Sequence, residues 1–90
     1  MRETSVTVSN TLGLHARAAA QLVRLSNEFS SSLIIKREDT AVTANAKSIL
    51  SVLSLAAGFG VQLHIIADGT DEAEALSAIE ELFQRKFGEP

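Results

Sequence analysis

The chain has 90 residues, 46% of them hydrophobic, and its formal net charge is −3, which together fit one globular domain over residues 1–90 with a small core. It has no cysteine, so disulfide frameworks, thiolate metal sites and thiol nucleophiles are excluded, and its apolar runs are too short to span a membrane. Residues 12–48 carry five cations, a poor footprint for nucleic acid but a suitable one for an anionic ligand or an acidic partner.

The first part of the chain predicts one strand and one helix. Residues 4–9 alternate valine with threonine and serine, the pattern of a half-buried strand, and residues 10–13 break that pattern. From residue 16 to about residue 27 the apolar positions recur with the spacing of an amphipathic helix, at Ala19, Leu22, Val23 and then Ser26. His15 is therefore expected at or beside the N-cap of this helix.

The remaining residues predict three further strands and two further helices. Residues 33–35 and 41–44 flank a polar run and predict a hairpin, although its turn lacks the favoured Asn-Gly pair. Residues 47–55 predict a short helix, and residues 61–67 predict a strand that Asp68-Gly69 ends. Asp71 is expected to cap the last helix, with Glu74 completing a capping box. That helix would bury Ala75, Leu76, Ile79, Leu82 and Phe83.

The predicted order of elements is βαββαβα. Strands interrupted by helices, with one hairpin, favour an α+β fold in which three helices cover one face of a four-stranded antiparallel sheet. The other face would be solvated, which explains the alternation in the first strand. His64 falls on that solvent-facing side of its strand, and we expect no functional role for it.

His15 is the strongest candidate for chemistry. The first N–H groups of a helix have no intrahelical partners and the helix dipole is positive there, so the place favours an anion. A phosphoryl group on the imidazole would find the N–H groups of residues 16–18, and Arg17 adds a cation suited to phosphate, with Arg24 on roughly the same side. An imidazole nitrogen is also a fair leaving group, as a carrier requires. From these residues alone, a surface histidine or a substitute cap remains the alternative.

Two separate stretches resemble the HPr family of histidine-containing phosphocarrier proteins of the phosphotransferase system. Gly13-Leu14-His15-Ala16-Arg17 is similar to the active-site motif of that family. Residues 45–55, which begin Asn45-Ala46-Lys47-Ser48, resemble its regulatory-serine helix. The predicted order of elements is also that of the family's open-faced β-sandwich, and the resemblance extends from about residue 5 to residue 87.

The resemblance implies a phosphoryl carrier, not an autonomous enzyme. His15 would be phosphorylated at Nδ1 and Arg17 would balance the phosphate charge. The donor would be enzyme I, itself phosphorylated from phosphoenolpyruvate, and the acceptors would be enzyme IIA domains, in sugar uptake or in nitrogen-related regulation. The family usually has proline where this chain has Ala18, which restores an N–H donor and slightly loosens the first turn.

Ser48 and the helix after it predict regulation and docking. Ser48 is placed to cap this helix, and the resemblance adds phosphorylation by HPr kinase/phosphorylase, which would block partners without unfolding the helix. Val52, Leu55 and Ala56 are expected to face the sheet. Exposed apolar residues beside cations favour a docking surface, which we assign to Ile49, Leu50 and Leu53 with Arg17, Arg24 and Lys47 as its charged rim.

Two other functions are weighed against the carrier. One is a regulatory binding module controlled by Ser48 phosphorylation, which His15 and Arg17 make less attractive. The other is an autonomous enzyme, for which the chain lacks a metal cluster, a glycine-rich phosphate loop and a Ser-His-acid set. We therefore expect a cytoplasmic carrier, monomeric as suits a shuttle, without cofactor, metal, nucleic-acid partner or membrane insertion.

Overall fold

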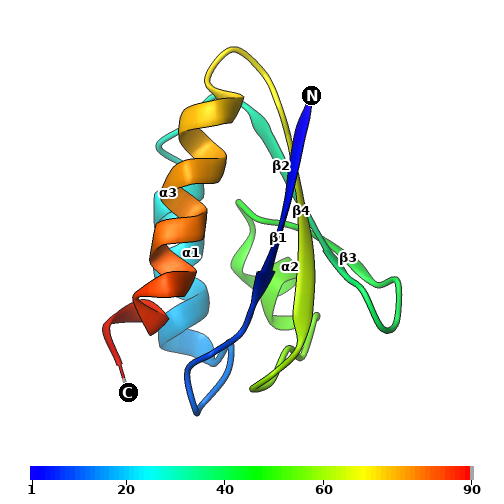
Figure 1. Cartoon of the computed structure of the whole chain (residues 1–90), viewed down its shortest axis with the longest axis vertical. Coiled ribbons are helices and arrows are strands. Elements are labelled where there is room, and N and C mark those ends of the chain that lie inside the picture. Colours follow the sequence, from blue (N-terminus) through cyan, green and yellow to red (C-terminus); the bar gives the residue numbers. More distant parts are fainter. Residues whose placement is uncertain (90) are drawn as a thin grey trace.

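Three helices pack on one face of a four-stranded antiparallel sheet (Figure 1). The structure is a computed structural model that describes residues 1–89. In chain order the elements are β1 (Arg2–Thr7), α1 (Ala16–Ser26), β2 (Ser32–Arg37), β3 (Thr43–Asn45), α2 (Ile49–Leu53), β4 (Gln62–Asp68), α3 (Glu72–Gln84) and a terminal 3₁₀ turn, η1 (Lys86–Gly88). The predicted βαββαβα order and the open-faced β-sandwich are confirmed.

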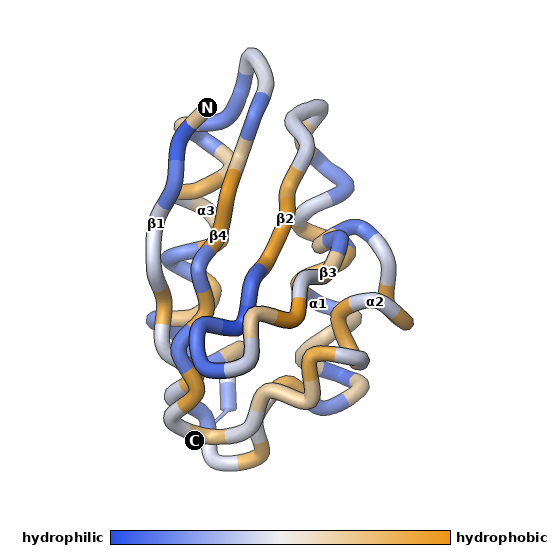
Figure 2. Tube along the Cα trace, turned by 90° about the vertical axis from the view of Figure 1, so that its right-hand side faces the viewer, coloured by the Kyte–Doolittle hydropathy of each residue, from blue (hydrophilic) through white to orange (hydrophobic). Residues whose placement is uncertain are grey.

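The strands lie in the order β1-β4-β2-β3, and each neighbouring pair is antiparallel. The two central strands are the most apolar, as the hydropathy colouring of Figure 2 shows. In β4, Leu63 and Ile65 point to the helices and are fully buried, while His64 between them is on the open face. There His64 contacts the Glu3 carboxylate and lies 3.4 Å from the Ser5 hydroxyl. The solvent-side position predicted for His64 is confirmed.

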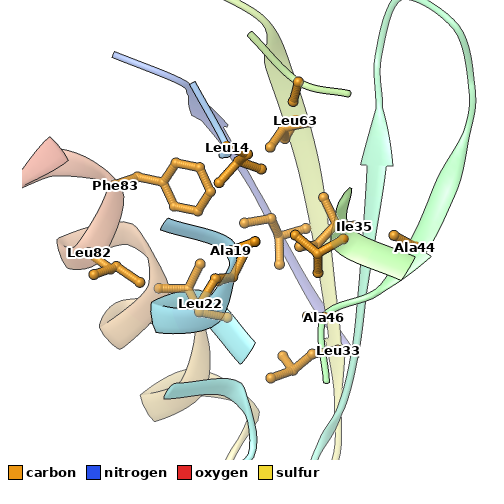
Figure 3. Close-up of a cluster of buried hydrophobic side chains, with 14 of the residues drawn as sticks. Leu14, Ala19, Leu22, Leu33, Ile35, Ala44, Ala46, Leu63, Leu82 and Phe83 are labelled. Carbon is orange, nitrogen blue, oxygen red and sulfur yellow. The ribbon is translucent and has the colours of Figure 1, made fainter. Parts of the chain in front are cut away.

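The core lies between the sheet and the helices, where Leu22 of α1, Ile35 of β2 and Phe83 of α3 converge (Figure 3). Leu14 points into the same core and is 6% exposed. Because Leu14 directly precedes His15, burial of its side chain anchors the backbone on the N-terminal side of the candidate residue. No helix within residues 1–89 is both long and apolar enough to span a membrane.

Two elements are shorter than their sequence patterns predict. The predicted strand at residues 41–44 begins only at Thr43, because Ala41 has φ +62° and belongs to a turn in which its N–H donates to the Arg37 carbonyl. The predicted helix at residues 47–55 is α2, whose five residues are followed by a turn. The expectation that Ala56 faces the sheet is wrong: Ala56 has φ +49°, which turns its side chain outward into solvent.

The capping box predicted at Asp71 and Glu74 is also wrong. Asp71 occupies the N-cap position of α3 but makes no capping bond with its side chain. Its carboxylate accepts from the Ser31 hydroxyl and from the N–H groups of Ser30 and Ser31, at 2.9 and 3.0 Å. These bonds, with that from the Ser31 hydroxyl the largest cause, lower the pKa of Asp71 from 3.8 to about 2. Asp71 thus joins the start of α3 to the segment before β2.

Candidate functional site

His15 is the N-cap of α1, as the sequence predicts. Its backbone is extended, with φ −72° and ψ 176°, and its carbonyl accepts the first helical hydrogen bond from Ala19 N–H at 2.8 Å. The ring turns toward the helix, where Nδ1 accepts from Arg17 N–H at 3.3 Å. One of the N–H groups expected to bind an anion is therefore directed at Nδ1 in the unmodified protein.

Gly13 fixes the approach of the chain to His15. It has φ +70°, and a Cβ added there would lie 2.9 Å from both the Ala57 oxygen and the Gly58 Cα. Leu14 N–H donates to the same Ala57 carbonyl at 2.9 Å. Only a residue without a side chain combines this backbone conformation with so close an approach. The loop before α1 is thereby held against the loop that leads from α2 to β4.

The other ring nitrogen of His15 faces a carboxylate. Nε2 lies 3.0 Å from Oε1 and 2.9 Å from Oε2 of Glu89, and the two side chains are only 24% and 15% exposed. A carboxylate can only accept and a backbone N–H can only donate, so Nε2 carries the proton and Nδ1 carries the lone pair. The contacts on its two sides thus assign the tautomer of the neutral ring.

Asn10 completes this arrangement by binding the Glu89 carboxylate. Its Nδ2 donates to the Gly13 carbonyl and to Glu89 Oε1, both at 2.8 Å, and the side chain is fully buried. Both partners are acceptors, which identifies the contacting atom as the amide nitrogen. The bond from Asn10, followed by the bond from His15, holds the pKa of the Glu89 carboxyl below its ordinary value.

A turn at the end of the chain brings Glu89 to this position. Lys86, Phe87 and Gly88 all have positive φ, at 54°, 56° and 75°, and they reverse the direction of the chain after α3. Phe87 is buried and packs edge-to-face on Phe83, with ring centroids 5.0 Å apart. Gln21 of α1 donates to the Phe87 carbonyl at 3.2 Å. The turn is therefore attached to both α1 and α3.

Glu89 and Asn10 were missed by the sequence analysis. Glu89 lies 74 positions from His15 along the chain and is one of seven acidic residues in the range 68–90, so no periodicity marks it. Asn10 belongs to a segment whose only visible feature is that it ends a strand pattern. The one local signal is Phe87, an apolar residue four positions after Phe83, which indicates that the chain stays on the core beyond the last helix.

The predicted cations differ in their surroundings. Arg17 is exposed in the first turn of α1, and its charge contributes to the lowered pKa of Glu89, which places it at the site. Arg24 is exposed in the last turn of the same helix. Lys47 is half-buried, and its ammonium group donates to the Phe29 carbonyl at 2.7 Å. Lys47 therefore binds the chain beyond α1 and does not extend into solvent.

The residues of α2 divide into capping, buried and exposed groups. Ser48 is the N-cap, as predicted, with its hydroxyl accepting from Ser51 N–H at 3.4 Å. Ile49 and Leu50 are 40% and 78% exposed, whereas Leu53 is half-buried and packs on the core. The structure therefore leaves Ile49 and Leu50 available at the surface and employs Leu53 mainly inside the molecule.

The geometry at His15 fits a nucleophile that receives an anionic group. Nδ1 carries the lone pair, it lies at the N-terminus of α1, and it accepts a hydrogen bond from Arg17 N–H. Within residues 1–89, no group of three or more His, Asp or Glu side chains is arranged to hold a metal ion. Phosphoryl transfer requires mainly positioning and stabilisation of charge, and the groups around Nδ1 can supply both.

Comparison with known proteins agrees with this chemistry. The model of the family described as PTS HPr component phosphorylation site matches residues 2–85. Phosphocarrier protein HPr of Treponema pallidum is 46% identical over 85 residues, which cover 94% of each chain. The crystal structure of HPr-C-His from Thermoanaerobacter tengcongensis is 38% identical, with a TM-score of 0.92 over 100% of this chain and 99% of that one.

An HPr dimer from the same organism, also 38% identical, superposes with a TM-score of 0.78 over 99% of this chain and 100% of that one. The family match covers nearly the whole sequence, and the solved structures share its sheet and its helices. The chain therefore belongs to the HPr family of the phosphotransferase system, whose members are phosphocarrier proteins and not catalysts.

Proposed function

We propose that His15 accepts a phosphoryl group on Nδ1 from enzyme I, itself phosphorylated from phosphoenolpyruvate, and passes it to enzyme IIA domains in the cytoplasm. The observation that carries the proposal is the environment of the ring. Nε2 is occupied by Glu89, while Nδ1 holds the lone pair and faces the N-terminus of α1. Residues 1–90 would act as one carrier domain.

The transfer is a displacement at phosphorus. The Nδ1 lone pair forms the new N–P bond, and the pair of the old bond to phosphorus leaves with the donor. The three oxygens of the transferred group then lie where N–H groups of residues 16–18 and the Arg17 guanidinium can bind them. Ala18 contributes to this set, because a proline there would remove one donor. The same steps in reverse order release the group to an acceptor.

Docking of the partners is assigned to Ile49, Leu50 and Leu53, with Arg17, Arg24 and Lys47 as the cationic rim; we call this set the docking surface. This assignment is supported by the exposure of Ile49 and Leu50 and by the exposed guanidinium groups on α1. Leu53 and Lys47 would contribute less, because Leu53 points inward and the Lys47 ammonium group is bonded to the Phe29 carbonyl. A small surface of this kind suits transient complexes that must also dissociate.

Ser48 offers a second candidate function, that of a regulatory module. Its hydroxyl caps α2 beside Ile49 and Leu50, so a phosphate added by HPr kinase/phosphorylase would place two negative charges next to the docking surface.

The carrier could serve either the sugar branch or the nitrogen branch of the phosphotransferase system. A monomer is the working state proposed for the shuttle, although the comparison includes an HPr dimer.

The test is phosphorylation by enzyme I and phosphoenolpyruvate, followed by intact-mass measurement before and after acid treatment. We expect an acid-labile gain of one phosphoryl group in the wild type and in His64→Ala, but no gain in His15→Ala. His64→Ala is the matched control, because it removes the second histidine from the open face of the sheet. A wild-type protein that gains no phosphate from a competent enzyme I would refute the carrier and favour the regulatory module.

A further inference from the structure

We propose that Glu89, held in place by Asn10, is a positioning residue for His15: its carboxylate keeps the proton on Nε2 and stabilises the positive charge that the ring acquires as Nδ1 bonds to phosphorus. This inference rests on the proposed function and assigns a role to a side chain that the active-site motif does not contain.

The contacts are those of a carboxylate built into the site. Both oxygens of Glu89 lie within 3.0 Å of His15 Nε2, and the fully buried Asn10 amide holds Oε1 at 2.8 Å. Asn10 also donates to the Gly13 carbonyl, so one side chain binds both the carboxylate and the loop before α1. A carboxylate that orients a histidine in this way fixes which ring nitrogen is the nucleophile.

The imidazole ring of His15 gains positive charge during the transfer. When the Nδ1 lone pair enters the N–P bond, the ring becomes a phosphoryl-imidazolium, with its positive charge shared between Nδ1 and the protonated Nε2. The Glu89 carboxylate then faces a cation where it previously faced a neutral donor. The attraction between the carboxylate and the ring is therefore greater after the attack than before it. The Glu89 side chain is only 15% exposed, so solvent screens this attraction less than it would at the surface.

Return of the phosphoryl group uses the same proton. A ring that remains protonated on Nε2 is a better leaving group, because the N–P electron pair returns to a nitrogen of an already cationic ring. Glu89 thus promotes both acceptance and release without taking the proton itself. The carboxylate of a Ser-His-Asp triad supports its histidine by the same electrostatic means.

The terminal turn shows how the chain holds Glu89 there. The left-handed region is sterically strained for residues with a side chain, and Lys86 and Phe87 both adopt it. Burial of the Phe87 ring against Phe83 and the bond from Gln21 to the Phe87 carbonyl offset this strain. A turn anchored in this way delivers the next side chains to a defined place.

The decisive variant is Glu89→Gln. Asn10 and His15 both contact Oε1, so a glutamine oxygen at this position keeps an acceptor for both donors. The substitution removes the charge and replaces Oε2, the second acceptor of His15 Nε2, by an amide nitrogen. Glu81→Gln is the matched control, since it removes one negative charge from an exposed position on α3. Both variants should melt close to the wild-type temperature, which circular dichroism verifies before any rate is compared.

The first readout is transfer from phosphorylated enzyme I. In Glu89→Gln we expect kcat to fall by about tenfold or more while KM stays near the wild-type value, since one charged hydrogen-bond partner of the ring becomes neutral. Glu81→Gln should match the wild type in both constants. If Glu89→Gln accepts phosphate at the wild-type rate, the inference is wrong and the proposed function stands.

The second readout is spontaneous hydrolysis of the phosphorylated protein as a function of pH. Protonation on Nε2 makes the N–P bond labile, so without the carboxylate the hydrolysis profile should move to lower pH. A purely structural role for Glu89 would leave this profile in place, as would the Glu81→Gln control. An unmoved profile in Glu89→Gln therefore counts against the inference even if the transfer rate falls.

Nitrogen-15 NMR of the unphosphorylated protein separates the two proposals. We expect a His15 Nε2–H signal that is protected from exchange in the wild type and is lost in Glu89→Ala. Absence of this signal in the wild type overturns the inference whatever enzyme I does. Failure of the wild type to accept phosphate while the signal is present overturns the proposed function, and the transfer role of Glu89 with it.

Discussion

At the scale of single residues, Arg17 is the group on which we expect the proposed anion site to depend most. Its guanidinium is exposed on the first turn of α1, so folding does not rely on it. We expect Arg17→Ala to slow phosphoryl acceptance about tenfold or more, and Arg17→Lys to recover part of the loss, because lysine keeps the charge but not the planar fork. Single-turnover transfer from phosphorylated enzyme I measures this, with Arg85→Ala as control. Equal rates in all three variants would contradict the role of Arg17.

Asp71 gives the molecule a pH dependence far from His15. Its folded-state pKa is lowered from 3.8 to about 2, mainly by the Ser31 hydroxyl, so the ionised form is favoured by folding. The stabilisation is complete above pH 3.8 and is lost as the pH falls toward 2. We expect Asp71→Asn to melt at a lower temperature than wild type at pH 7, with the difference closing in that acid range.

Thermal melts between pH 2 and pH 7 test this expectation. Glu74→Gln is the matched control, because it removes a charge from the same turn of α3 without touching Ser30 or Ser31. A difference between Asp71→Asn and wild type that stays constant down to pH 2 would show that the carboxylate charge contributes nothing.

Prediction from sequence succeeded for single residues where the interaction is local. The position of His15 as N-cap and that of Ser48 follow from the start of a periodic pattern. The pairing of Glu89 with His15 joins residues 74 positions apart, and that of Asp71 with Ser31 spans 40. Such pairs depend on how complete elements dock, and no spacing within one element contains that information.

At the scale of elements, the loop before α1 depends on Gly13. An alanine there would combine a left-handed backbone, which costs about 1–2 kcal/mol, with a Cβ only 2.9 Å from the Ala57 oxygen. We expect Gly13→Ala to lower the melting temperature and to slow phosphorylation of His15. Gly60→Ala is the control, since Gly60 also has positive φ but nothing lies within 4 Å of its Cβ position. Equal losses in both variants would show that the contact with Ala57 is unimportant.

The start of α2 separates capping from regulation at Ser48. Ser48→Ala removes the hydroxyl that accepts from Ser51 N–H and should cost about 0.5–2 kcal/mol of stability. Ser48→Asp restores a capping acceptor but adds charge beside Ile49. We therefore expect its stability to be near wild type and its affinity for enzyme I to be lower. Urea unfolding and calorimetric titration measure the two effects, and wild-type affinity in Ser48→Asp would argue against regulation by charge.

Elements are predicted well where one face is buried along their whole length. The periodicity of α1 and α3 and the alternation of β4 locate those elements, because each of them packs along the core. The start of β3 and the end of α2 are less well predicted, since a residue with positive φ lies close to each, Ala41 before β3 and Ala56 after α2. Ala56 belongs to such an end, which explains its outward position.

At the scale of the whole molecule, we expect the proposed docking to be separable from folding. Leu50 is 78% exposed, so Leu50→Ser should change the free energy of unfolding by no more than about 0.5 kcal/mol. If Leu50 is buried against enzyme I, the dissociation constant should rise by about tenfold or more. Val42→Ser, at an exposed position in the turn between β2 and β3, should leave it unchanged. Calorimetric titration decides, and unchanged affinity in Leu50→Ser would remove Leu50 from the docking surface.

The strand order also has a consequence for biosynthesis. β1 is made first, yet the one strand it pairs with is β4, which lies beside it in Figure 1. In this pair Arg2 is opposite Ala67. One edge of β2 likewise remains without a hydrogen-bonding partner until β4 has been made. While the ribosome is still translating, the β2–β3 hairpin is the sole part of the sheet that can form. Closure of the sheet is therefore delayed until residue 68 has emerged, and the nascent chain exposes its apolar strands until then.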